Sequence, residues 1–176
     1  AERCAMEPFA DASATFPCHS SDPVDPGYDD ENDFRKLGFV RGPITAGTVL
    51  FVPDGETDAQ ERALAVIPGG LERQAESGSG KVVYVVDLAT GVKIAEFPNA
   101  TGSNVEDDNY PAAGGGSLDA DGLDVPMTGP PTCFSTAPGT HMSRCFIGDA
   151  LGQMWYLRFN GTDPDGWTLS FFHDAY

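Results

Sequence analysis

The sequence predicts an all-β fold built from antiparallel hairpins. Glycine (21 residues) and proline (14 residues) together exceed their average usage, yet stay below the share that marks disorder. Two segments, 81–97 and 145–159, each contain a strand, a tight turn with Asp and Gly, and a returning strand. No segment has the pattern of an amphipathic helix longer than two turns. Many short strands joined by turns account for these observations.

The first hairpin starts with the clearest strand of the chain, Val82–Leu88. This run is rich in valine and apolar on both faces, which predicts an inner strand of a fold with several packed sheets. Ala89-Thr-Gly91 supplies the turn, because Gly91 can take a positive φ. Val92–Phe97 then returns as the partner strand.

The second hairpin has a strand at Arg144–Ile147, a turn at Gly148–Gly152 and a return strand at Gln153–Phe159. Its similarity to the first hairpin suggests a repeated β-unit. Side chains alternate between the two faces of a strand. The return strand therefore places Gln153, Trp155, Leu157 and Phe159 on one face, and Met154, Tyr156 and Arg158 on the other.

The remaining predicted strands are shorter. Thr48–Pro53, Thr132–Phe134 and Trp167–Phe172 each predict a strand. Residues 59–67 are compatible with a helix by propensity, or with a return strand at 63–67, and we favour the strand with an irregular insertion before it. The loop-rich segment 98–131 is long enough to suggest a functional, stapled or metal-bound loop.

Two domain-level regions follow from this pattern. Residues 1–36 contain four prolines that block long elements, which predicts an irregular N-terminal segment. The strand-rich remainder, 37–176, forms the β domain. The acidic cluster Tyr28–Phe34 at the junction is either a solvated loop or a loop for calcium or surface recognition.

The charge balance excludes several classes of partner. The net charge is −17, from 27 acidic and 10 basic residues. Nucleic acids and anionic membranes are poor partners, because binding to phosphate requires lysine and arginine. No apolar run reaches 18 residues, so no transmembrane helix is predicted.

The four cysteines fall into two local pairs, Cys4 with Cys18 and Cys133 with Cys145. No Cys-x-x-Cys is present and the histidines are scattered, which argues against a zinc site. Two local disulfides are favoured, although four cysteines permit three connectivities. Disulfides imply an oxidising compartment: the periplasm, the cell surface or the medium.

Three groups of residues carry possible chemistry. Asp119, Asp121 and Asp124 surround a glycine as in calcium loops, or form an acidic turn whose side chains lie in water. His141 is close to Ser143 in sequence, but no serine lies in a nucleophile elbow, so we expect no catalytic residues and no enzyme. The aromatics Trp155, Tyr156 and Trp167 form either a sugar platform or, as we favour, core packing.

Two stretches resemble known β-propeller families. Val82–Gly91, with its strand, Asp and Thr-Gly turn, looks like a blade of a quinoprotein-type β-propeller. Phe146–Phe159 is similar to a blade in the PilY family, in which a Gly-Asp-x-x-Gly-x-x-Trp hairpin follows an acidic calcium-type loop. Here Asp119–Asp124 precedes Gly148-Asp149 in the same order. The resemblance covers roughly residues 80–172.

The resemblance implies several blades of a partial or modified β-propeller. A blade needs about 40–45 residues, so the chain is either part of a larger propeller or has edges that another chain completes. PilY-type proteins act at the tip of type IV pili, so we expect an extracellular adhesin or pilus assembly factor. Its partners would be minor pilins or a host or abiotic surface, with calcium as a possible cofactor. The alternatives are a fragment or subunit of a periplasmic quinoprotein-like dehydrogenase, or a scaffold subunit completed by a partner chain.

Overall fold

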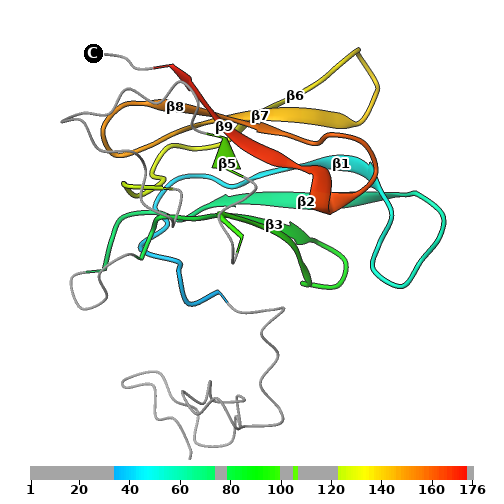
Figure 1. The fold of residues 1–176 in the computed structure, drawn as a ribbon, viewed down its shortest axis with the longest axis horizontal. Coiled ribbons are helices and arrows are strands. Elements are labelled where there is room, and N and C mark those ends of the chain that lie inside the picture. The colour runs from blue at the N-terminus through cyan, green and yellow to red at the C-terminus, as the bar shows by residue number, and fades with distance from the viewer. Residues whose placement is uncertain (1–33, 74–78, 100–104, 107–122, 174–176) are drawn as a thin grey trace, which may run out of the picture. The chain divides into compact units, whose positions relative to one another are not determined.

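The computed structural model describes residues 34–73, 79–99, 105–106 and 123–173. The chain divides after Asp33 into two units, and the described residues all belong to the second. The predicted N-terminal segment 1–36 therefore lies almost wholly outside the described residues. The described part is all-β, with nine strands in two sheets and one short 3-10 helix. Figure 1 shows the two sheets as stacked layers.

The first sheet is a four-stranded antiparallel meander. Its strands are β1 (Thr45–Phe51), β2 (Gln60–Pro68), β3 (Val83–Asp87) and β4 (Lys93–Phe97), and they lie side by side in chain order. The expected strand within 63–67 is confirmed, but the expected irregular insertion before it is wrong at residues 60–62. There β2 continues to pair with β1, as far as Gln60 opposite Phe51, so tertiary pairing overrides helix propensity.

The second sheet contains a second four-stranded antiparallel meander. Its strands are β6 (Thr132–Ser135), β7 (Met142–Gly148), β8 (Met154–Arg158) and β9 (Thr168–His173). The two-residue strand β5 (Val105–Glu106) pairs in parallel with β9 and was not expected within the long loop. The 3-10 helix η2 (Pro164–Gly166) lies in the connection between β8 and β9.

Both predicted hairpins form, but they occupy different places in their meanders. The first hairpin joins the third and fourth strands of its meander, whereas the second hairpin joins the second and third strands of its meander. The similarity of the two sequences thus reflects the chemistry of an Asp-Gly turn. The position of this turn differs by one strand between the two meanders. The turn glycines Gly91 (φ 77°) and Gly152 (φ 83°) have the left-handed conformation that favours glycine.

A shared core joins the sheets. β1 contacts β6 and β7 in the other sheet, and the fully buried Trp155 and Trp167 lie in the same hydrophobic cluster as Phe51 and Phe97. The Trp167 ring meets Phe51 edge-on at 5.8 Å and Phe159 at 4.8 Å between centroids. Burial of such large rings supplies much of the driving force that holds one sheet against the other.

A short segment at residues 126–129 also ties the sheets together. On one side Met127 exchanges backbone hydrogen bonds with Gly70 (2.8 Å) and Gly80 (2.9 Å), next to the first sheet. On the other side, Gly129 donates to the carbonyl of Gly148 (2.8 Å), and Pro126 accepts from Ala150 (2.9 Å) in the turn of the second sheet. We call residues 126–129 the strap, because its hydrogen bonds reach both sheets.

The outer face of the first sheet is covered by the chain itself. Val82, Tyr84 and Val86 form a second buried cluster with Phe34 and Leu37 packed against it. This explains why β3 is buried on both faces, as expected from its valines: Val83 and Val85 face the other sheet. The Phe34 ring meets Tyr84 edge-on at 5.1 Å.

The expected disulfide between Cys133 and Cys145 is present. The two residues are direct partners in the β6–β7 ladder, with Cα atoms 4.0 Å apart, and Cys145 is fully buried. Cys4 and Cys18 lie outside the described residues. The bridge links the edge strand β6 to its neighbour β7.

We expect the double variant Cys133→Ser/Cys145→Ser to lose about 2–3 kcal/mol of unfolding free energy, because the open chain gains conformational freedom when unfolded. Urea denaturation followed by tryptophan fluorescence measures the loss. Dithiothreitol should destabilise the parent protein by at least this amount. An equally stable double variant would contradict the expectation, and any further effect of dithiothreitol on that variant reports on Cys4 and Cys18.

Candidate functional site

The residues predicted to bind calcium are only partly described. Asp119 and Asp121 lie outside the described residues, while Asp124 is partly buried. Among the described residues, no group of three or more His, Cys, Asp or Glu side chains is arranged to hold a metal ion. The strap, which begins two residues after Asp124, does contact the turn of the second hairpin at Gly148 and Ala150.

His141 and Ser143 do not form a catalytic pair. His141 Nε2 lies 3.3 Å from the Glu61 carboxylate, and the Ser143 hydroxyl donates a 3.3 Å hydrogen bond to the carbonyl of Phe134. Each side chain thus has a different partner, and both residues are partly exposed.

Asp149 organises the turn of the second hairpin. Asp149 is 6% exposed, and its carboxylate accepts three hydrogen bonds. One oxygen accepts from the backbone amides of Leu151 and Gln153, both at 2.9 Å, and the other accepts from the indole Nε1 of Trp155 at 3.0 Å. The Gly-Asp-x-x-Gly-x-x-Trp pattern is therefore a structural device: the aspartate fixes the turn and holds the tryptophan in the core.

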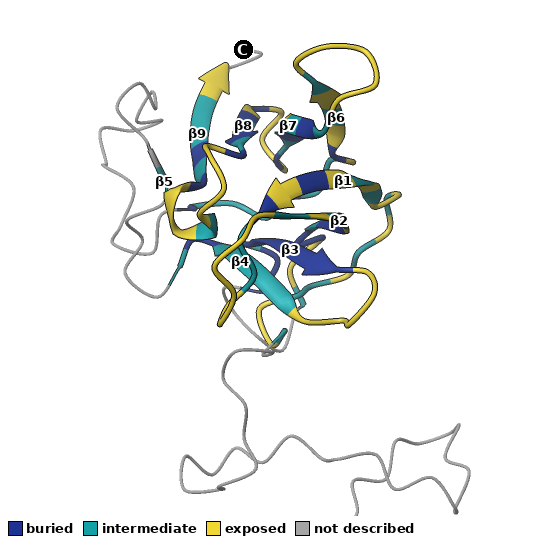
Figure 2. Ribbon diagram, turned by 90° about the vertical axis from the view of Figure 1, so that its right-hand side faces the viewer, coloured by how far each residue is buried: buried dark blue, intermediate teal, exposed yellow. Residues whose placement is uncertain are grey.

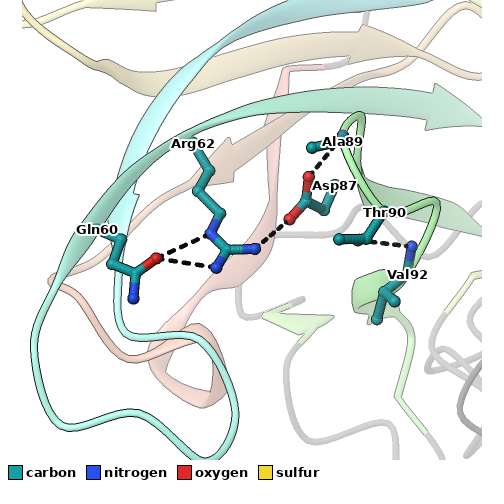
Figure 3. Close-up of polar contacts among 6 residues, drawn as sticks. All are labelled: Gln60, Arg62, Asp87, Ala89, Thr90 and Val92. Carbon is teal, nitrogen blue, oxygen red and sulfur yellow. Dashed lines mark hydrogen bonds and ion pairs between the residues drawn. The ribbon is translucent and has the colours of Figure 1, made fainter.

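Asp87 has the corresponding place in the first hairpin. One of its oxygens accepts from the Ala89 amide at 2.8 Å, and the other accepts from Arg62 Nη1 at 2.8 Å (Figure 3). Gln60 completes the group by accepting from Arg62 Nε and Nη2 through its side-chain oxygen. Asp87 is 1% exposed, so this ion pair is largely withdrawn from water on the aspartate side.

The pKa of Asp87 reflects two opposing effects. Burial raises the pKa of this carboxyl, but the hydrogen bond and charge of Arg62, with the Ala89 amide, outweigh burial and hold the pKa below its ordinary value of 3.8. The carboxylates of Asp87 and Asp149 thus form their hydrogen bonds within the fold. Their role is to shape turns.

The feature that stands apart from this internal network is the outer face of the second sheet. Four rings, one from each strand of the meander, pack there. The Phe146 ring stacks on Tyr156 at 5.0 Å and meets Phe172 edge-on at 5.0 Å, and Phe134 lies 6.1 Å from Phe146. Phe172 is 55% exposed and Phe134 is 47% exposed. Figure 2 shows the exposed ends of β6 and β9 on the two sides of the more buried β7 and β8.

Two arginines share this face with the rings. Arg144 on β7 and Arg158 on β8 are direct cross-strand partners, and Arg144 also pairs with Phe134 on β6. The Arg158 guanidinium lies 5.6 Å from the Tyr156 ring centroid and donates to the Ser170 hydroxyl at 3.4 Å. We define the aromatic–basic face by these side chains: Phe134, Arg144, Phe146, Tyr156, Arg158 and Phe172.

Only part of this face is predictable from the sequence. The predicted alternation along β8 is confirmed, since Trp155 and Leu157 are buried while Met154, Tyr156 and Arg158 face outward. The sugar-platform alternative for Trp155, Tyr156 and Trp167 is wrong, because both tryptophans are fully buried in the core. The signal that could have revealed the face is that the four strands β6, β7, β8 and β9 contain no Asp or Glu in so acidic a chain.

No protein-family model, curated protein or solved structure matches this chain. Among the described residues, no helix is both long and apolar enough to cross a membrane.

Proposed function

We propose that the chain is a non-enzymatic binding component of the cell surface, built from blades of β-propeller type. One observation carries the proposal: two successive four-stranded antiparallel meanders share a core, with the first strand β1 of one against β6 and β7 of the other. Propeller blades are meanders of this kind that stack face to face. The second sheet, from Thr132 to His173, has the length of about 40–45 residues usual for a blade.

Two blades do not close a propeller, which typically has four to eight. The proposal therefore requires more sheets, from further sequence or from another chain. The aromatic–basic face supports this view, since the second sheet has exposed rings on its outer side, whereas the first sheet is covered by Phe34 and Leu37. A binding component whose sheets are completed by a partner chain is also consistent with the alternative of a scaffold subunit.

The resemblance to the PilY family supports type IV pili as the biological system. Its motif residues are the ones that form the Asp149 turn, and the Cys133–Cys145 disulfide suits an oxidising location outside the cytoplasm. Together they support a role at the tip of a type IV pilus, where the chain would contact minor pilins or a surface.

Co-purification with purified minor pilins tests this proposal. The tagged chain, produced under oxidising conditions, should retain at least one minor pilin through size-exclusion chromatography. An unrelated β-rich domain of similar negative charge is the control for nonspecific retention. Loss of every pilin at the same rate as in the control would contradict the pilus assignment. A chromophore retained after mixing with pyrroloquinoline quinone would overturn the non-enzymatic role in favour of a quinoprotein.

A further inference from the structure

We infer that the aromatic–basic face binds an extended acidic peptide segment, carrying at least one aromatic side chain, from another protein chain. This inference names the partner chemistry for the binding role proposed above and rests on that role. It does not require the pilus system.

The charge distribution points to an acidic partner. The chain carries 27 acidic residues, yet the strands β6, β7, β8 and β9 contain none. Arg144 and Arg158 stand directly opposite each other, and like charges in this position destabilise a sheet. The exposed Arg144 guanidinium makes no hydrogen bond or ion pair with another residue in the described part of the chain. A carboxylate beside it would offset the repulsion.

The first sheet shows how this fold covers such a face. There the segment at Phe34–Leu37 lies over Tyr84 and brings both an aromatic ring and a charge. Lys36 of that segment pairs with Glu96 of β4 at 2.6 Å. On the second sheet the positive charge lies on the sheet itself, as arginine, and not on a covering segment. A covering segment of the same kind would therefore bring a ring and carboxylates.

The alternatives fit the face less well. A second copy related by a two-fold axis would place the same face against itself and bring four arginines together. An anionic glycan would gain few hydrogen bonds from the rings, because three of the four are phenylalanines without a hydroxyl. A peptide can add apolar side chains to the ring cluster and carboxylates to the arginines at once.

A random copolymer of glutamate and tyrosine, fluorescently labelled, serves as the probe in anisotropy titrations at about 0.15 M salt, where long-range repulsion from the acidic chain is screened. We expect saturable binding, with polyglutamate at least tenfold weaker and a lysine–tyrosine copolymer not competing. The double variant Arg144→Gln/Phe172→Ser should weaken binding at least tenfold. Its matched control, Arg41→Gln/Leu88→Ser, removes an exposed arginine and an exposed apolar side chain elsewhere and should bind as the parent does.

Circular dichroism and the melting temperature establish that both double variants are folded. Equal binding by the two variants, or no binding by the parent, would overturn the inference. Competition by alginate as strong as by the copolymer would assign the face to a glycan, and a Phe172-dependent dimer in sedimentation would assign it to a second copy. If the double variant Arg144→Gln/Phe172→Ser still co-purified with a pilin, the aromatic–basic face would not be the binding surface, but the proposed function would stand.

Discussion

Replacing Asp149 by alanine should destabilise the protein by about 3–5 kcal/mol, equivalent to a fall of roughly 10 °C in melting temperature. The substitution leaves three donors without their acceptor: the amides of Leu151 and Gln153 and the indole N–H of Trp155. The Trp155 side chain is fully buried, so water cannot replace the carboxylate without opening the core. Urea unfolding monitored by tryptophan fluorescence measures the change.

Two matched variants show whether the effect belongs to these hydrogen bonds. Asp163 also accepts a hydrogen bond from the amide two residues later, Asp165, but it is exposed, so Asp163→Ala should cost only about 0.5–1 kcal/mol. Asp149→Asn keeps an oxygen for the backbone amides but can lose the indole bond, and should fall between the two alanine variants. Equal losses for Asp149→Ala and Asp163→Ala would show that the buried network adds nothing.

Replacing Arg62 by methionine should cost about 3 kcal/mol near neutral pH, because it leaves the Asp87 carboxylate buried without its cation. We take the lower end of the range for buried pairs, since the Arg62 side chain is 30% exposed. Methionine preserves most of the apolar stem. The loss is measured as the difference in unfolding free energy between parent and variant.

The pH dependence of this difference has a definite sign. In the parent, the pKa of Asp87 is held below 3.8, so its ion pair contributes stability above that pH and loses it as pH falls through the folded pKa. In Arg62→Met only burial and the turn hydrogen bond remain, so the pKa of Asp87 rises and the carboxyl becomes neutral sooner. The penalty of the substitution should therefore shrink as the pH falls below about 4.

The double variant Arg62→Met/Asp87→Asn completes the cycle. It removes both charges, so it should recover part of the loss and show no such pH dependence between pH 3 and 7. Other carboxyl groups titrate in all variants and largely cancel in the differences. A penalty that stays constant over this range, or grows on acidification, would contradict the assigned role of Arg62.

Strand positions were largely predictable from the sequence because the turns carry their own chemistry. An aspartate followed by a glycine at positive φ marks both hairpins, and the alternation along Gln153–Phe159 correctly separates buried from outward side chains. The Cys133–Cys145 disulfide was equally predictable, because each cysteine lies in or next to a predicted strand. Local signals suffice where a turn or a short loop determines the pairing.

What could not be predicted depends on pairing between distant strands. The start of β2 at Gln60 is set by its ladder with β1, and no local pattern in residues 60–62 encodes it. The aromatic–basic face exists only because Phe134, Phe146, Tyr156 and Phe172 come from four strands in a particular register. A slip of one residue in any strand would send its ring to the core.

The strap at residues 126–129 has a consequence for cooperativity. Its backbone is hydrogen-bonded to Gly70 and Gly80 on one side and to Gly148 and Ala150 on the other. Opening either sheet alone would break these bonds and also uncover the rings of Trp155 and Trp167. The two meanders therefore cannot melt as independent modules, and a half-chain that ends at Phe97 would lack the bonds that close the end of its own sheet. Each sheet therefore depends on the other for its stability.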